Sequence, residues 1–185
     1  MKKFFFTSFF ILITVVAFAQ QTEKSKPKFQ SLLQLGFVEG NAGNAFQLQA
    51  INSFDFSCFS AGIGVGLDYY GTRSVPLFFD IRKNILRKPQ TPFLFLDAGI
   101  HFPWINQNSE WQIVRTKPGL FYEAGIGYNI PLQSHAITFS AGYSYKAYKE
   151  EIETPVWCLR GDCANDVQKL SYQLRRISIK AGFRF

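Results

Sequence analysis

The sequence predicts an all-β fold, namely an eight-stranded antiparallel up-and-down transmembrane β-barrel. Along eight segments of roughly ten residues, apolar side chains alternate with polar or small ones, which is typical of strands with one lipid-facing side and one lumen-facing side. A charged start and an apolar run open the chain as in secreted proteins. Phenylalanine occurs 21 times and aromatic residues reach 17%, an excess that indicates apolar side chains on the surface.

The first residues predict export from the cytoplasm. Lys2 and Lys3 precede an apolar run over 4–18, and Ala17 and Ala19 supply the small residues of a cleavage site. The run is shorter than the ~20 residues of a spanning helix, which disfavours the alternative of a membrane anchor. We therefore expect a signal peptide over 1–19, a short polar segment over 20–28 and the barrel over 29–185.

Period-2 alternation places the strands at 30–39, 44–52, 59–70, 77–84, 93–102, 120–129, 137–146 and 176–185. An Ala-Gly pair recurs at 61–62, 98–99, 124–125, 141–142 and 181–182, and alternation turns every Ala outward and every Gly inward. Inward glycine leaves room for large side chains in a lumen that is only just wide enough for them. We expect arginine at outward Ile126 to be more harmful than serine at inward Gly127.

The segments between the strands differ in length, as they do in bacterial barrels. Short periplasmic turns are expected near 54–56, 86–92 and 131–135, and short outer loops near 39–43 and 71–74. Long outer loops are expected over 103–118 and 149–169. An aromatic girdle at the outer interface is predicted from Tyr69, Tyr70, Trp104, Trp111, Tyr148 and Trp157.

Two stretches, "SAGIGVGLDYYGTRSVPLFFDIRKNIL" over 60–86 and "TPFLFLDAGIHFPW" over 91–104, resemble a known family. It is the family of eight-stranded outer-membrane barrels of the OmpA transmembrane-domain and OmpX type, in the versions found in Bacteroidota. The resemblance implies an outer-membrane location, contact with its lipid, and recognition of Phe183 and Phe185 by the outer-membrane assembly machinery. The family hosts adhesins, defence proteins and small enzymes, so the resemblance leaves the function open.

Charged residues on the lumen face are the first candidate site. The set comprises Asp68, Asp80, Arg82, Asp97, Glu123, Lys146, Arg176, Lys180 and Arg184. We expect opposite charges to pair inside the narrow barrel, because an unpaired buried charge is costly. An ion or proton path through the same residues is the alternative.

His101, which alternation turns inward near the outer rim, is a candidate catalytic residue. Asp97 precedes it by four residues, Ser109 follows in the next loop, and His135 lies on a turn at the opposite rim. This combination could serve acyl transfer on lipid. No nucleophile motif surrounds any serine, however, and the sequence predicts no enzyme and no cofactor.

The segment "CLRGDC" over 158–163 is the most distinctive part of the last outer loop. In a secreted chain, Cys158 and Cys163 are expected to form a disulfide, since two thiols without a nearby histidine are a poor metal site. Between them lies the tripeptide Arg160-Gly161-Asp162, a candidate for surface adhesion. Cys58 is expected to be a free thiol, and no metal site is predicted.

Charge and pattern together favour a monomeric barrel with a filled lumen and a structural or surface-interaction role through the outer loops. The net charge of +7 falls to +5 when Lys2 and Lys3 are removed, and it is spread along the chain, which argues against nucleic acid as a partner. A narrow porin, a lipid-modifying enzyme and a soluble lipocalin-like barrel are the alternatives.

Overall fold

The computed structural model describes residues 26–56, 58–86, 88, 90–104, 108–109, 112–154 and 166–185. The described chain folds into one antiparallel sheet. Its strands are β1 (Lys28–Gly40), β2 (Gly43–Asp55), β3 (Phe59–Asp68), β4 (Ser74–Asn84), β5 (Thr91–Pro103), β6 (Asn108–Ser109), β7 (Gln112–Lys117), β8 (Gly119–Leu132), β9 (His135–Thr154) and β10 (Asp166–Arg184). Across these residues we find no helix with the length and apolar character needed to cross a membrane.

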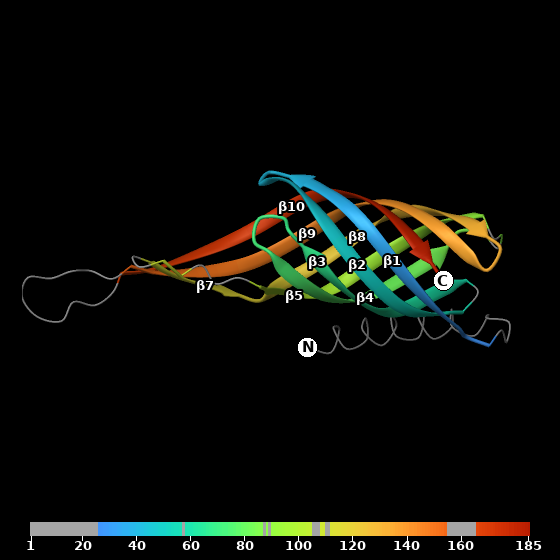
Figure 1. Ribbon diagram of the computed structural model, residues 1–185, viewed down its shortest axis with the longest axis horizontal. Helices are drawn as coiled ribbons and strands as arrows, with labels where there is room; N and C mark the ends of the chain where they lie inside the picture. Colours follow the sequence, from blue (N-terminus) through green and yellow to red (C-terminus); the bar gives the residue numbers. More distant parts are fainter. Residues whose placement is uncertain are drawn as a thin grey trace, which may run out of the picture.

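Eight of these strands form a closed ring, which confirms the predicted barrel (Figure 1). The ring runs β1, β2, β3, β4, β5, β8, β9, β10 and returns to β1, because β10 pairs with both β9 and β1. The closing ladder joins Leu32 with Arg184 at one end and Gly40 with Arg176 at the other. Two further backbone hydrogen bonds, of 2.8 and 2.9 Å, join Ser31 and Phe185, so pairing reaches the last residue.

The predicted inward and outward faces are confirmed on every strand of the ring. In β4, Leu77, Phe79 and Ile81 are exposed, whereas Phe78 and Asp80 are buried. The exposed large apolar side chains recur around the barrel wall. A contiguous apolar face of this extent indicates a surface that contacts lipid rather than water.

Inward glycines make room for aromatic rings, as alternation predicted. A Cβ atom on Gly64 would overlap the ring of Phe78, and one on Gly127 would overlap the ring of Phe93. The lumen is therefore filled by large side chains from one strand that lie over glycines of the next.

The two long outer loops were predicted wrongly in extent. β9 continues to Thr154 and β10 begins at Asp166, and these extensions pair with each other beyond the ring. β6 and β7 lie within 103–118, and β7 pairs with residues 149–153 of β9. We call this projecting sheet the β-arm: β6, β7, residues 149–154 and residues 166–175 (Figure 1). Charged residues on both faces of 149–153 hide the period-2 hydrophobic pattern, while backbone pairing continues without it.

Two members of the predicted aromatic girdle face inward instead. Tyr70 and Tyr148 are buried, while Tyr69 and Trp104 are exposed as expected. Tyr70 lies under the guanidinium of Arg176, and Tyr148 stacks on Tyr172 at the entrance to the lumen. Tyr70 faces inward because its ring contacts the Arg176 guanidinium and its hydroxyl accepts a hydrogen bond from the Ala42 N–H, whereas Tyr148 packs against rings inside the barrel and on the β-arm. The two tryptophans Trp111 and Trp157 lie outside the described residues.

The register can be tested at Ile126 and Gly127. Ile126→Arg should cost about 2–4 kcal/mol, since it places a charge in lipid near the middle of β8. The structure changes the expectation for Gly127→Ser, because Phe93 and the carbonyl of Phe139 crowd this glycine. Overpacking there should cost about 1–3 kcal/mol. Urea unfolding in lipid vesicles measures both, with Ile126→Val as control. Wild-type stability of Ile126→Arg would contradict the register.

Candidate functional site

The charged residues of the lumen come together in layers along the barrel. Asp68, Asp80, Asp97 and Glu123 are buried, and so are Arg82, Lys146, Arg176 and Lys180. Arg184 is half-buried at the end of the barrel that holds the chain terminus. Four buried carboxylates thus face four buried cations, so the interior of the described barrel is close to electrically neutral.

The layer nearest the β-arm is built around Asp68. Its carboxylate accepts a hydrogen bond of 2.5 Å from Nη1 of Arg176, and Nζ of Lys146 lies 3.7 Å away. The other terminal nitrogen of Arg176 donates to Ser144 Oγ at 2.8 Å. The Tyr70 ring faces this guanidinium with 5.2 Å from its centroid to Cζ. One carboxylate therefore joins strands β3, β9 and β10 across the lumen.

Lys146 also fastens the outer loop between β3 and β4. Its ammonium donates to the backbone carbonyls of Tyr70, at 3.0 Å, and Thr72, at 2.6 Å. Because a buried ammonium requires acceptors, these carbonyls hold the loop down over the lumen.

The middle layer begins with three acidic residues on neighbouring strands. Asp80 is the register partner of Asp97, which in turn is the partner of Glu123. Lys180 reaches them from β10, with Nζ 2.7 Å from Glu123 and 3.7 Å from Asp97. Ser178 donates a short hydrogen bond to the same glutamate. Lys180 is thus the cation on which Glu123 and Asp97 depend.

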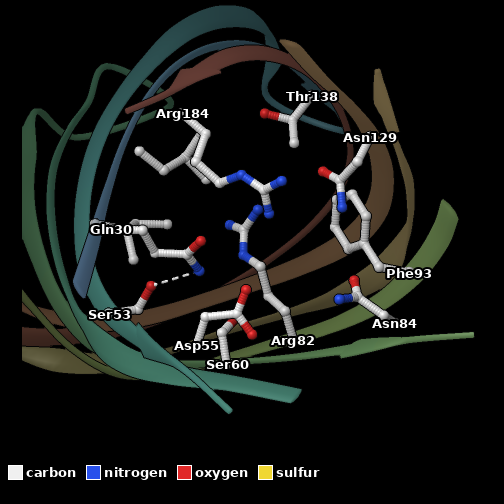
Figure 2. Close-up of a pocket in the computed structure, with 12 residues that line it drawn as sticks. Gln30, Ser53, Asp55, Ser60, Arg82, Asn84, Phe93, Asn129, Thr138 and Arg184 are labelled. Atoms are coloured by element: carbon white, nitrogen blue, oxygen red, sulfur yellow. Dashed lines mark hydrogen bonds between the residues drawn. The ribbon is translucent and has the colours of Figure 1, made fainter. Parts of the chain in front are cut away.

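The third layer lies near the chain terminus and contains Arg82. Its Nε donates to Asp80 at 2.9 Å, and its guanidinium lies 5.4 Å from the ring centroid of Phe93 and 5.8 Å from that of Phe95. Arg82 also lines a small cavity of about 10 Å³, which we call the mouth pocket (Figure 2). Its other polar lining residues include Arg184, Asp55, Asn129 and Thr138. This volume is close to the space that one water needs.

An apolar plug of buried side chains also fills the lumen. Phe78 and Phe121 lie with ring centroids 5.5 Å apart, and both belong to a buried cluster with Leu32 and Ile51. These side chains come from strands around the ring. The lumen formed by the described residues is therefore filled by rings and ion pairs, and its cavity near the terminus is water-sized.

Among the described residues, His101 contacts a backbone carbonyl and an aromatic ring. Its Nε2 is 2.8 Å from the carbonyl oxygen of Ala147, its ring packs edge-on against Tyr148, and its buried Nδ1 has no hydrogen-bond partner among the described residues. Asp97, the proposed orienting group, lies instead near Lys180. Ser109 falls in β6, and His135 begins β9 beside Phe183. Within the described residues, Asp97 is thus paired with a lysine and is not a hydrogen-bond partner of His101.

Two solvent-accessible ion pairs lie on the β-arm. Nζ of Lys117 donates to Glu151 at 2.6 Å, which holds the pKa of that exposed carboxyl below its ordinary value. Arg115 lies 3.8 Å from Glu153 on the next pair of strand positions. Between the arm and the loop at Gly71 is a cleft of about 450 Å³, lined also by Thr72, Arg73, Val114, Thr116, Glu150 and Ile152.

Several predicted residues fall outside the described chain. These are the signal peptide over 1–19, Cys158, Cys163 and the tripeptide Arg160, Gly161 and Asp162, so the disulfide and the adhesion motif stay predictions. Cys58, at the turn before β3, forms no disulfide among the described residues. Within the described ranges, no group of histidine, cysteine and carboxylate side chains is arranged to hold a metal.

The terminal aromatic residues face outward at the barrel wall. Phe183 and Phe185 stack with centroids 6.3 Å apart, and both are exposed. Their position suits contact with lipid. Their recognition by an assembly machinery stays a prediction.

The closed eight-stranded ring with an apolar outer wall defines the architecture of an outer-membrane β-barrel. Among solved structures, the outer membrane protein OprG from Pseudomonas aeruginosa is similar, with a TM-score of 0.63 at 9% identity over 85% of this chain and 95% of that one. Neisserial surface protein A is similar with a TM-score of 0.52 at 14% identity, over 86% and 98%. No family model matches the sequence. No curated protein matches it either.

Uncharged polar residues that bind the charged lumen residues were not among the predicted site residues. Ser144, Ser178 and Gln49 bind Arg176, Glu123 and Lys180 respectively. Alternation does place these three side chains inward. An uncharged polar residue on the lumen face of a strand is the signal that could have identified them, and Ser144 also lies opposite charged Arg176 and Glu123.

Lys180→Met should be strongly destabilising, because it leaves Glu123 and Asp97 buried beside each other without their cation. We expect a loss of about 3–5 kcal/mol. Adding Glu123→Gln to Lys180→Met should recover part of this loss. Lys117→Met, which breaks an exposed pair on the β-arm, is the control and should cost far less than Lys180→Met, because solvent screens the exposed pair. Equal losses for Lys180→Met and Lys117→Met in urea unfolding would show that the lumen pairs are not required.

Proposed function

We propose that this outer-membrane barrel is a closed scaffold that presents the β-arm outside the cell for binding an extended segment of another protein. The observation that carries the proposal is the continuation of β9 and β10 beyond the ring as a paired sheet joined by β7. A filled lumen supports the display role, since the barrel then contributes rigidity rather than a passage.

The direction of the arm follows from the two ends of the barrel. Short turns of two to six residues, at 133–134, 56–58 and 85–90, lie at the end that also holds the chain terminus, and the arm lies at the other end (Figure 1). Bacterial barrels have short turns on the periplasmic side and long segments outside. The arm is therefore on the extracellular side.

The edge of β10 gives the arm its binding chemistry. β1 pairs with β10 only up to Arg176, so residues 166–175 have no strand partner on that side among the described residues. In antiparallel pairing, the N–H and C=O of one residue point to the same neighbour and alternate residues point to opposite neighbours. Phe185 points to β1, and the register is regular, so Lys169, Ser171 and Gln173 direct their backbone groups to the open edge.

An open edge of this kind accepts an added strand from a partner. Val167 and Leu170 are exposed along it and supply apolar contacts. The cleft beside Glu150 and Arg73 offers both signs of charge close by. These features fit an extended peptide better than a small apolar solute.

The alternative of a narrow porin lacks an open lumen in the described structure. For the alternative of a lipid-modifying enzyme, no side-chain nucleophile forms a hydrogen bond with His101 among the described residues. The display role accounts for both the filled lumen of the barrel and the projecting β-arm. The observation favouring it over a passive structural barrel is the unpaired edge of β10.

Ser171→Pro tests the proposal because it removes one edge N–H and leaves the pairing with β9 in place. Peptides selected for binding to the wild-type chain in lipid nanodiscs should bind Ser171→Pro about tenfold more weakly, since one lost hydrogen bond and its steric consequence exceed ~1.4 kcal/mol. Ser171→Ala, which keeps the N–H, should bind within about twofold of wild type.

Both variants should keep the heat-modifiable mobility of a folded barrel on gels. Failure to select any extended peptide, or equal binding by Ser171→Pro and wild type, would refute strand addition at this edge. Inaccessibility of the arm to protease on intact cells would refute its display outside.

A further inference from the structure

The mouth pocket has an arrangement that the scaffold role does not use. It opens at the periplasmic end of the lumen, and polar side chains from around the ring line it. In Figure 2, the guanidinium groups of Arg82 and Arg184 point toward one another across the space, with Asn129 and Thr138 on one side. Two cations that converge in a narrow, partly buried site repel each other, so their approach calls for a compensating group.

Arg82 is only partly compensated by protein. Its Nε side is taken by Asp80, but its Nη2 is buried and has no hydrogen-bond partner among the described residues. Arg184 and Asp55 line the same pocket as Arg82 (Figure 2). Asp55 brings a negative charge to the pocket, yet the Nη2 of Arg82 has no acceptor among the described residues.

The pocket wall holds further polar atoms without partners. The hydroxyl of Thr138 and the side-chain oxygen of Asn129 are buried and make no hydrogen bond within the described structure. Thr138 can donate into the pocket, and rotation of the Asn129 amide exchanges its oxygen for an N–H donor. Buried polar atoms that lack a protein partner normally form hydrogen bonds with a water or an ion.

We propose that the mouth pocket binds one small monovalent anion of halide size between Arg82 and Arg184. The Arg82 Nη2, the Arg184 guanidinium and the Thr138 hydroxyl supply the donors. The cavity of about 10 Å³ admits one water-sized occupant, and Arg184 at the mouth can move outward to accept a slightly larger halide. Sulfate and phosphate are excluded by size and by the nearby carboxylate of Asp55.

Bromide shows the site directly, because its anomalous scattering locates it in crystals of the wild-type chain. Crystals grown in sodium bromide should show one anomalous peak between Arg82 and Arg184. An empty or water-filled mouth, with bromide only elsewhere on the surface, would overturn the proposal. This experiment uses the wild-type chain, so its outcome does not depend on whether a variant folds.

Thermal unfolding in detergent measures the same binding in solution. Replacing gluconate by chloride at constant ionic strength should raise the Tm of the wild-type chain by about 2–4 °C. Arg184→Gln should lose this chloride response. Arg175→Gln, which removes an exposed cation from the preceding part of β10, is the control and should keep it. The same response in Arg184→Gln and wild type, or no response in wild type, would also overturn the proposal.

Discussion

The structure depends on the closure of the ring by the β1–β10 ladder. In lipid, an open edge would leave a row of N–H and C=O groups without partners, each costing several kcal/mol. Nine residue pairs from Leu32 with Arg184 to Gly40 with Arg176, extended by the Ser31–Phe185 bonds, remove that cost. Closure with eight strands also fixes the width of the lumen, so that side chains fill it. The composition of the interior follows from this one constraint.

A narrow closed lumen permits charge only where charge is compensated. Asp68 on β3 binds Arg176 on β10, Glu123 on β8 binds Lys180 on β10, and Asp80 binds Arg82 within β4. The first two pairs join strands that are not neighbours in the sheet, so they cross-link the barrel through its lumen. Outside the ring, the constraint ends, and β9 and β10 continue with exposed ion pairs and, on β10, an edge that has no strand partner among the described residues.

Much of the barrel could be predicted because alternation is a local signal. Ile126 and Gly127 show their faces from the sequence, and glycine opposite a large ring follows from the width of the lumen. The β-arm could not be predicted, because Lys149 to Glu153 carry charge on both faces and so lack the period-2 hydrophobic pattern of a strand. The inward turn of Tyr70 and Tyr148 depends on where the ring ends, which a strand pattern does not reveal. Which charged side chains pair with each other could not be predicted either, because it depends on how far distant strands are shifted along one another in the closed barrel.

Single-channel recording in planar lipid bilayers tests the central claim, a lumen closed by its own side chains, most directly. The wild-type chain should insert without stepwise conductance, because Phe78, Phe121 and the layered ion pairs leave no continuous aqueous path. Phe78→Ala combined with Phe121→Ala, which removes the apolar plug, should give small steps if the protein inserts folded. Regular, uniform conductance steps from the wild-type chain would contradict the account.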